Sequence, residues 1–293
     1  MPLDYQKLMS WPFAAITRTY GKADSIRFAR GFGAGIDPLW TSTDSHFIED
    51  NTALQALPMS AVALADGEFW QQDPQSGIAW QQMVHAQESL RIHRPLPAEG
   101  TVVVTQKIQD IFDRGPEKGA LMVQNQWLSD EQGNPLASIE VTTVLRGNGG
   151  FGGKLPPPAR PEPIPERAAD AVLQIKTPVG ADTLFRLSSE IAVAARTDTA
   201  NQHYMLRGLG CFGLAGRGAM KMACDNNPNC LRAIGVRYAG PMFTNETMRL
   251  EMWYVRPGHA LFRMHACERD APVLSYGFIE FDTACENQDP APN

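Results

Sequence analysis

Residues 206–224 read LRGLGCFGLAGRGAMKMAC, a mostly apolar stretch with a glycine at every second or third position. Its length and apolar character make it the best candidate for a long helix in the second half of the chain. Each glycine costs about 1 kcal/mol relative to alanine in an exposed helix. A buried helix can use glycines, because a missing side chain lets a strand, another backbone or a ligand approach closely. The stretch therefore predicts a buried helix with close neighbours.

The segments around this helix predict antiparallel strands, and the first half of the chain repeats the same order. Residues 24–34 have apolar positions at helical spacing after Asp24, a candidate N-cap. In both halves strand-like runs follow the helix: 89–93, 101–112, 120–128 and 137–145 in the first, and 233–238, 248–254, 260–266 and 273–281 in the second. A helix followed by antiparallel strands, occurring twice, predicts an α+β fold built from two copies of one domain type, each sheet curled around its own helix.

A proline-rich segment separates the two halves. Residues 154–168, KLPPPARPEPIPERA, have almost no apolar periodicity and predict an extended, semi-rigid connector. We therefore expect an N-terminal half at 1–153, a connector at 154–172, a C-terminal half at 173–283 and a flexible tail at 284–293.

Composition excludes some classes of function. The chain has 293 residues, a net charge of -6 and no basic run, which argues against a nucleic-acid partner. No apolar run approaches the roughly 18 residues of a membrane span, and the N-terminus does not look like a secretory signal. The five cysteines include no CxxC pair, which favours reduced thiols over a disulfide framework and argues against a zinc site. We expect a cytoplasmic protein without a bound metal.

Five separated segments, in order along the chain, carry a resemblance to a known family. They are VHAQESLRIHRPLP (84–97), RGNGGFGGK (146–154), LFRLS (184–188), LRGLGCFGLAGR (206–217) and VRYAGPMFTNETMRLEMW (236–253). Together they resemble the MaoC-like double hot-dog proteins, which include the (R)-specific enoyl-CoA hydratases. The resemblance implies two hot-dog folds with an acyl-CoA site between them. It also implies reversible addition of water to a trans-2-enoyl-CoA, with CoA as part of the substrate and no separate cofactor. The first half would widen the tunnel for bulky acyl chains.

Hydration of a conjugated thioester needs a base for water, an acid for the α-carbon and donors for the developing enolate oxygen. Gly208 matches the glycine that forms the family's oxyanion hole, and an amide at a helix N-terminus is a suitable donor. A packing glycine is the alternative. Arg207 stands where the family has a histidine, and we expect it to contact a CoA phosphate or a substrate carboxylate, or else to form a surface ion pair. His85 is expected to be a structural hydrogen-bonding residue at the interface of the repeats.

The acid/base residues depart from the family's pattern. Glu190 stands where the family has its aspartate, and Ala192 and Ala195 stand where it has its asparagine and histidine. One interpretation is that the site has moved within the loop to a trio with similar spacing: Asp198, Asn201 and His203. The other interpretation is that the site is lost and the protein binds acyl-CoA without turnover.

These observations leave three candidate functions. The first is an (R)-specific 2-enoyl-CoA hydratase, or 3-hydroxyacyl-CoA dehydratase, with a degenerate Asp/His motif. The alternatives are a catalytically inactive acyl-CoA-binding subunit that partners an active hydratase, and an acyl-CoA thioesterase. In each case we expect a homodimer or a hetero-oligomer with another hot-dog protein.

Overall fold

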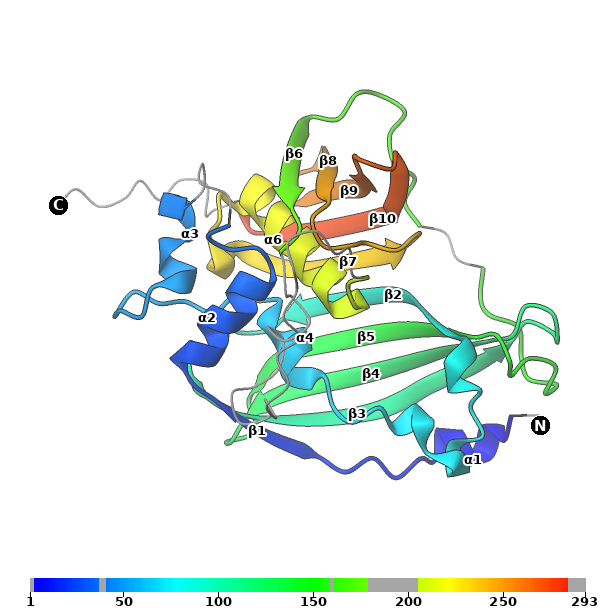
Figure 1. Ribbon diagram of the computed structural model, residues 1–293. Helices are drawn as coiled ribbons and strands as arrows, with labels where there is room; N and C mark the ends of the chain where they lie inside the picture. Colours follow the sequence, from blue (N-terminus) through cyan, green and yellow to red (C-terminus); the bar gives the residue numbers. More distant parts are fainter. Residues whose placement is uncertain (1–2, 37–40, 159–160, 179–204, 284–293) are drawn as a thin grey trace.

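The computed structural model describes residues 3–36, 41–158, 161–178 and 205–283. In these residues ten antiparallel strands form one sheet in the order β1-β3-β4-β5-β2-β7-β10-β9-β8-β6, with the helices on its concave face (Figure 1). The strands are β1 Ile16–Tyr20, β2 Met83–Ile92, β3 Gly100–Asp113, β4 Ala120–Asp130, β5 Pro135–Leu145, β6 Ala171–Lys176, β7 Leu231–Tyr238, β8 Thr247–Arg256, β9 His259–Ala266 and β10 Ala271–Phe281. The helices are α1 Tyr5–Met9, α2 Lys22–Gly31, α3 Thr41–Ile48, α4 Ser60–Ala65 and α6 Gly208–Cys224, with short 3-10 turns at Trp70–Gln72, Pro74–Ser76, Trp80–Gln82 and Pro228–Cys230.

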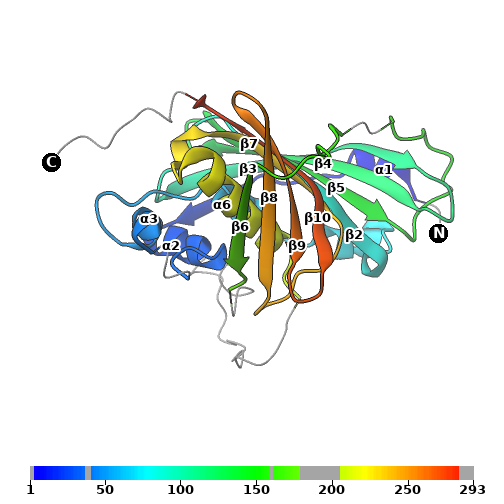
Figure 2. The ribbon, with the colours of Figure 1, turned by 90° about the horizontal axis from the view of Figure 1, so that it is seen from above.

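The two halves of the chain share this sheet. Strand β2 of the first half pairs with β7 of the second, with Leu90 opposite Ile234. Seen from above, β6, β8, β9 and β10 lie at one end of the sheet beside α6 (Figure 2). The α+β class expected from the sequence is confirmed. The division at 1–153, 154–172 and 173–283 stays a prediction, and residues 284–293 lie outside the described part of the chain.

The start of α2 differs from expectation. The N-cap is Gly21, and Asp24 is the third helical residue, whose Oδ2 accepts a hydrogen bond from the Gly21 amide at 2.9 Å. Aspartate suits both positions, because its carboxylate can bond free amides of the first turn from either place.

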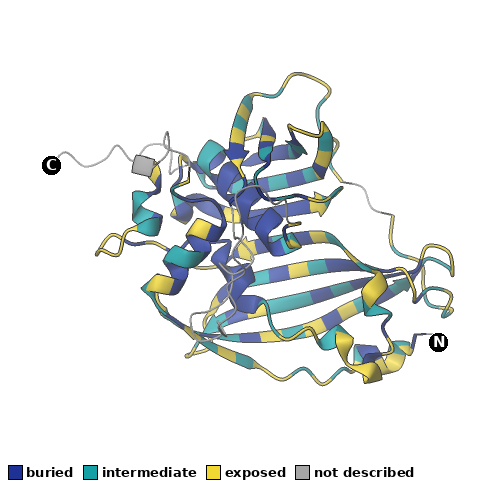
Figure 3. Cartoon of the chain, in the orientation of Figure 1, coloured by how far each residue is buried: buried dark blue, intermediate teal, exposed yellow. Residues whose placement is uncertain are grey.

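Helix α6 is buried along most of its length, and a band of buried residues follows it and the strands that face it (Figure 3). A Cβ atom on Gly213 would lie 1.8 Å from Cδ1 of Phe32. A Cβ on Gly216 would lie 2.7 Å from Cγ of Met59. These contacts confirm that the glycines let neighbouring elements approach the helix.

Two expectations about the whole chain can be compared with the structure. Cys211 is a buried free thiol and Cys267 an exposed one, but Cys230 is disulfide-bonded. The expectation of reduced thiols is therefore wrong at Cys230, since an odd cysteine count does not exclude a single bridge. Among the described residues, no helix is long and apolar enough to cross a membrane.

Candidate functional site

The N-terminus of α6 presents backbone donors at the junction of the two halves. Arg207 is its N-cap, has an extended backbone, and makes no side-chain hydrogen bond to the first turn. The first amides of a helix have no partner inside the helix and lie at the positive end of its dipole. The start of α6 is therefore suited to bind a carbonyl oxygen or another electron-rich atom.

The ring of His85 lies directly against this helix start. A Cβ atom on Gly208 would be 2.7 Å from His85 Nδ1 and 3.4 Å from the Tyr238 hydroxyl. The ring centroids of His85 and Tyr238 are 4.7 Å apart. A residue larger than glycine at position 208 would displace His85. Close packing therefore requires a glycine here, in addition to the role in an oxyanion hole expected from the sequence.

A β-bulge in β2 brings His85 and Glu88 to the same face of the sheet. In the pairing with β5, His85 lies opposite Thr143 and Gln87 lies opposite Thr142, so Ala86 is the extra residue. Residues three apart on a regular strand point to opposite faces, and one inserted residue reverses that relation. As a result His85 Nε2 lies 3.7 Å from Glu88 Oε2.

Glu88 is a buried carboxyl group with one close polar neighbour. Its Oε2 lies 2.7 Å from the Tyr238 hydroxyl, which is also 2.9 Å from the Gly208 carbonyl oxygen. Tyr238 has one hydroxyl proton and can donate it to only one of these two acceptors at a time. Burial raises the pKa of Glu88, while the nearby His85 and the Tyr238 hydrogen bond act in the opposite direction. Burial also raises the pKa of Tyr238, so this phenol stays protonated.

The structure describes two of the site residues expected from the sequence, Gly208 and Arg207. An Arg207 guanidinium nitrogen lies 3.0 Å from Asp66 Oδ2, and both side chains are partly exposed. This is the surface ion pair considered as the alternative to a substrate contact. Four further candidates, and the two alanines aligned with the family's asparagine and histidine, lie outside the described residues: Glu190, Asp198, Asn201, His203, Ala192 and Ala195.

His85 lies where the sequence placed it, at the interface of the repeats, because β2 pairs with β7. Within the described part of the chain its Nε2 makes no hydrogen bond, although a structural hydrogen-bonding role was expected. Glu88 and Tyr238 were not expected in the site. A His-x-x-Glu pattern on a strand places the two side chains on opposite faces unless a bulge intervenes, and nothing local in the sequence marks the bulge.

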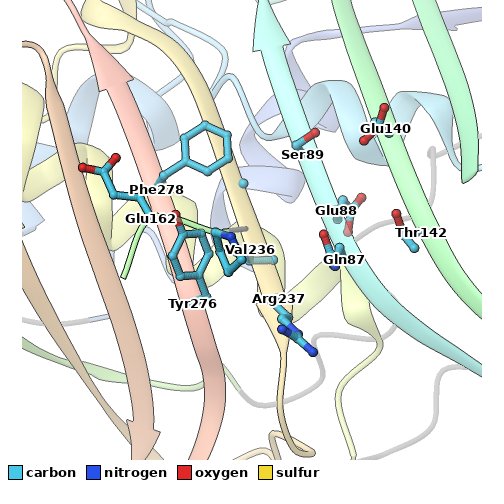
Figure 4. A pocket seen from close by; sticks show the side chains of 12 residues that line it. Gln87, Glu88, Ser89, Glu140, Thr142, Glu162, Val236, Arg237, Tyr276 and Phe278 are labelled. Carbon is cyan, nitrogen blue, oxygen red and sulfur yellow. The ribbon is translucent and has the colours of Figure 1, made fainter. Parts of the chain in front are cut away.

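A cavity of about 380 Å³ lies on the opposite face of the sheet, at the seam of β2, β7 and β10 (Figure 4). Ile234 packs near α6, whereas the next residue, Gly235, would place a Cβ 2.4 Å from the ring of Phe278 on the other face. Gln87, Ser89, Arg237 and Tyr276 line this pocket, together with Glu162 from the connector. The pocket and the start of α6 therefore lie on opposite faces of the sheet, and Glu88 of β2 borders both.

Comparisons with known proteins identify the family of the chain. A family model described as "MFE-2 hydratase 2 N-terminal domain" matches residues 19–147. The chain is 31% identical to 3-hydroxyacyl-thioester dehydratase Y of Mycobacterium tuberculosis, over 88% of this chain and 91% of that protein. The chain belongs to the MaoC-like hydratase family.

Two further similar proteins extend the comparison. Peroxisomal multifunctional enzyme type 2 of Drosophila melanogaster is 28% identical over 90% of this chain, which spans only 46% of that longer enzyme. The crystal structure of the MaoC-like dehydratase from Phytophthora capsici has a TM-score of 0.77 and 25% identity, covering 97% of this chain and 99% of that one. The tandem hot-dog fold expected from the sequence is confirmed.

The site contains no cluster suited to a metal ion in the part of the chain that the structure describes. No three histidine, cysteine, aspartate or glutamate side chains there come together in such a group. What the described site offers is a set of backbone amides, an imidazole and a carboxyl group, which suits binding and proton transfer on a thioester.

Proposed function

We propose that this protein adds water to a trans-2-enoyl-CoA to give an (R)-3-hydroxyacyl-CoA, or catalyses the reverse dehydration. The observation that carries the proposal is the uncapped start of α6 at Gly208, with an imidazole packed against it. Relatives named 3-hydroxyacyl-thioester dehydratase Y and probable enoyl-CoA hydratase 2 support the same reaction. The two alternatives, an inactive acyl-CoA-binding subunit and a thioesterase, receive no support from those relatives.

In this proposal the thioester carbonyl oxygen accepts a hydrogen bond from the Gly208 amide. As water adds to C3, negative charge develops on this oxygen, and a preorganised backbone donor stabilises it more than it stabilises the neutral substrate. Arg207 at the edge of the site is a candidate contact for the CoA phosphates, in exchange for its ion pair with Asp66. Catalytic roles for Glu190, Asp198 and His203, and a substrate contact for Asn201, stay predictions.

Several broader expectations remain proposals alongside the reaction. The substrate is an acyl-CoA thioester, and the reaction uses no cofactor beyond the CoA of the substrate. Assembly as a homodimer or with another hot-dog protein would be tested by light scattering of the purified protein. A cytoplasmic location would be tested by cell fractionation.

The direct test is a hydration assay with crotonyl-CoA and with longer or ring-bearing enoyl-CoAs. We expect loss of the enoyl absorbance and formation of the (R)-3-hydroxyacyl-CoA, identified by chiral chromatography. Gly208→Ala should lower kcat/KM by on the order of 100-fold, because its methyl group would crowd the histidine and the carbonyl site. Cys267→Ser, at an exposed residue outside the site, is the matched control and should leave the activity unchanged.

Other outcomes of this assay identify the alternatives. Binding of CoA esters without turnover of any enoyl-CoA would reject the hydratase and favour the binding subunit. Release of free thiol without prior loss of the enoyl absorbance would favour the thioesterase.

A further inference from the structure

We propose that His85 is the group that transfers the proton in the hydration reaction, and that Glu88 is its positioning residue. This inference rests on the proposed function and adds a catalytic residue from the first half of the chain. The residues aligned with the family's asparagine and histidine are Ala192 and Ala195, which have no proton to exchange. The acid/base group therefore stands at another position than in the family, either in the loop trio predicted above or in another part of the molecule.

The position of His85 satisfies the first requirement for such a group. Its Nδ1 would be 2.7 Å from a Cβ on Gly208, so the imidazole borders the first turn of α6. A thioester whose carbonyl oxygen is bound at the Gly208 amide has C2 and C3 one and two bonds beyond the carbonyl carbon. The histidine thus lies beside the space that the reacting carbons would occupy.

The state of the ring satisfies the second requirement. The His85 side chain is 32% exposed, but its Nε2 is buried toward Glu88, so solvent and substrate can reach only the rest of the ring. Among the described residues, no partner hydrogen-bonds its Nε2. A neutral imidazole has one nitrogen that accepts and one that donates, and it changes charge near neutral pH. Because Nε2 is buried toward Glu88, the nitrogen that exchanges a proton with the substrate is Nδ1, which borders Gly208.

The proposed step balances with a single histidine. Neutral His85 takes a proton from water as the water oxygen forms a bond to C3. The electrons of the C2–C3 double bond move to form the enolate of the thioester, whose oxygen is held at Gly208. The imidazolium then returns its proton to C2, and the carbonyl group re-forms. One water molecule has been added and His85 is neutral again.

Glu88 supports this cycle from inside the protein. Its Oε2 lies 3.7 Å from His85 Nε2, close enough to stabilise the imidazolium electrostatically when the carboxyl group is ionised. The Tyr238 hydroxyl, 2.7 Å away, fixes the carboxyl group. Among the residues that the structure describes, the other ionisable groups around the pair are Cys211 in the first turn of α6 and the Arg207–Asp66 ion pair at its edge.

The test compares His85→Asn and His85→Gln with the wild-type enzyme on whichever enoyl-CoA the protein hydrates. Both replacements keep a polar side chain but cannot exchange the proton, so kcat should fall by on the order of 100- to 10,000-fold with little change in KM. Added imidazole should restore part of the activity of His85→Ala, because it can occupy the vacated space. His93→Asn is the matched control, since His93 is an exposed histidine on the same half whose ring lies 3.0 Å from the Ser138 hydroxyl, and the activity of this variant should be unchanged.

The role of Glu88 is tested by Glu88→Gln and the pH dependence of kcat/KM. The acid limb of the kcat/KM profile should lie at lower pH in Glu88→Gln than in the wild type, because the variant lacks the carboxylate that stabilises an imidazolium. An unchanged kcat and pH profile would overturn the positioning role.

Two results would overturn the proposal for His85 itself. One is a folded His85→Asn or His85→Gln variant with kcat within about threefold of the wild type. The other is a failure of imidazole to restore any activity to a folded His85→Ala variant. Either result leaves the proposed function intact if the wild type still hydrates enoyl-CoA, whereas an inactive wild type would reject the function instead.

Discussion

At the scale of single residues, Asp113 organises the glycine-rich segment that follows β5. Its Oδ1 accepts hydrogen bonds from the amides of Gly115 and Gly150, at 2.9 and 2.8 Å, and its Oδ2 accepts one from Gly152 at 2.7 Å. Gly150 and Gly152 have φ angles of 79° and 83°, which L side chains rarely adopt. These hydrogen bonds hold the pKa of Asp113 below its ordinary value of 3.8, and the bond from the Gly150 amide has the largest effect. The segment thus depends on an ionised carboxylate.

Asp113→Asn should destabilise the protein by about 1–3 kcal/mol at neutral pH, because an amide NH2 would face a backbone N–H. A depressed pKa contributes stability that is fully present above the unfolded value and is lost as the pH falls through the folded value. The difference between wild type and variant should therefore shrink below pH 3.8. Urea unfolding from pH 7 to about pH 3 measures it, with Glu131→Gln in an exposed turn as control. A difference that does not change with pH would contradict the role of the charge.

At the scale of elements, the packing of α6 explains why its sequence has so many glycines. Phe32 from the first half packs onto Gly213, and Met59 packs onto Gly216. On the side of the second half, a Cβ on Gly218 would lie 2.4 Å from Cδ1 of Ile175 in β6. The helix is in close contact with both halves. The space available beside it therefore decides the residues at these positions more than helix propensity does.

Gly213→Ala tests this conclusion, because helix propensity and packing predict changes of opposite sign in the free energy of unfolding. Helix propensity alone predicts a gain of about 1 kcal/mol. A methyl group 1.8 Å from the Phe32 ring predicts a loss of about 1–3 kcal/mol through overpacking instead. Chemical denaturation decides between them. Phe32→Leu in the same chain should reduce the cost of the added methyl, and a stabilised Gly213→Ala variant would show that the contact is loose.

At the scale of the whole molecule, a buried ion pair joins the two halves next to the shared sheet. Arg217 on α6 contacts Asp44 on α3, and their side chains are 1% and 0% exposed. Asp44 also accepts hydrogen bonds from the Gly35 amide at 2.9 Å and from Nδ2 of Asn226 at 3.2 Å. One large hydrophobic cluster spans both halves as well. We therefore expect the halves to unfold together.

Asp44→Ala should lower the free energy of unfolding by about 3–5 kcal/mol, because it removes the carboxylate that a buried guanidinium contacts. The double variant Asp44→Leu, Arg217→Met should lose much less, since neither charge is then buried. Urea unfolding followed by fluorescence and by circular dichroism should give one coincident transition for the wild type. A double variant whose loss of unfolding free energy equals the sum of the losses of its two single variants would contradict this coupling. So would two separate unfolding transitions in the wild type.

The elements themselves were largely predictable from the sequence, because their patterns are local. The helix at 206–224 and the four strands after it appear as α6, β7, β8, β9 and β10 with shifts of one or two residues. The two end strands of the sheet, β1 and β6, were missed. They are only five and six residues long, so they show too little periodicity. The sequence placed Gly208 at the start of this helix, which is where α6 begins, and its role in an oxyanion hole stays a prediction.

The sequence by itself determined the α+β class, the glycine-rich central helix and the family, since each depends on the order and spacing of residues along one segment. Only the tertiary structure decided which ionisable groups stand at the start of that helix. His85 and Glu88 come from a bulged strand of the first half, and Tyr238 comes from the strand of the second half that pairs with it. Their meeting at Gly208 depends on strand register and on one extra residue in β2. Both follow from contacts between segments far apart in the chain, which no local pattern records.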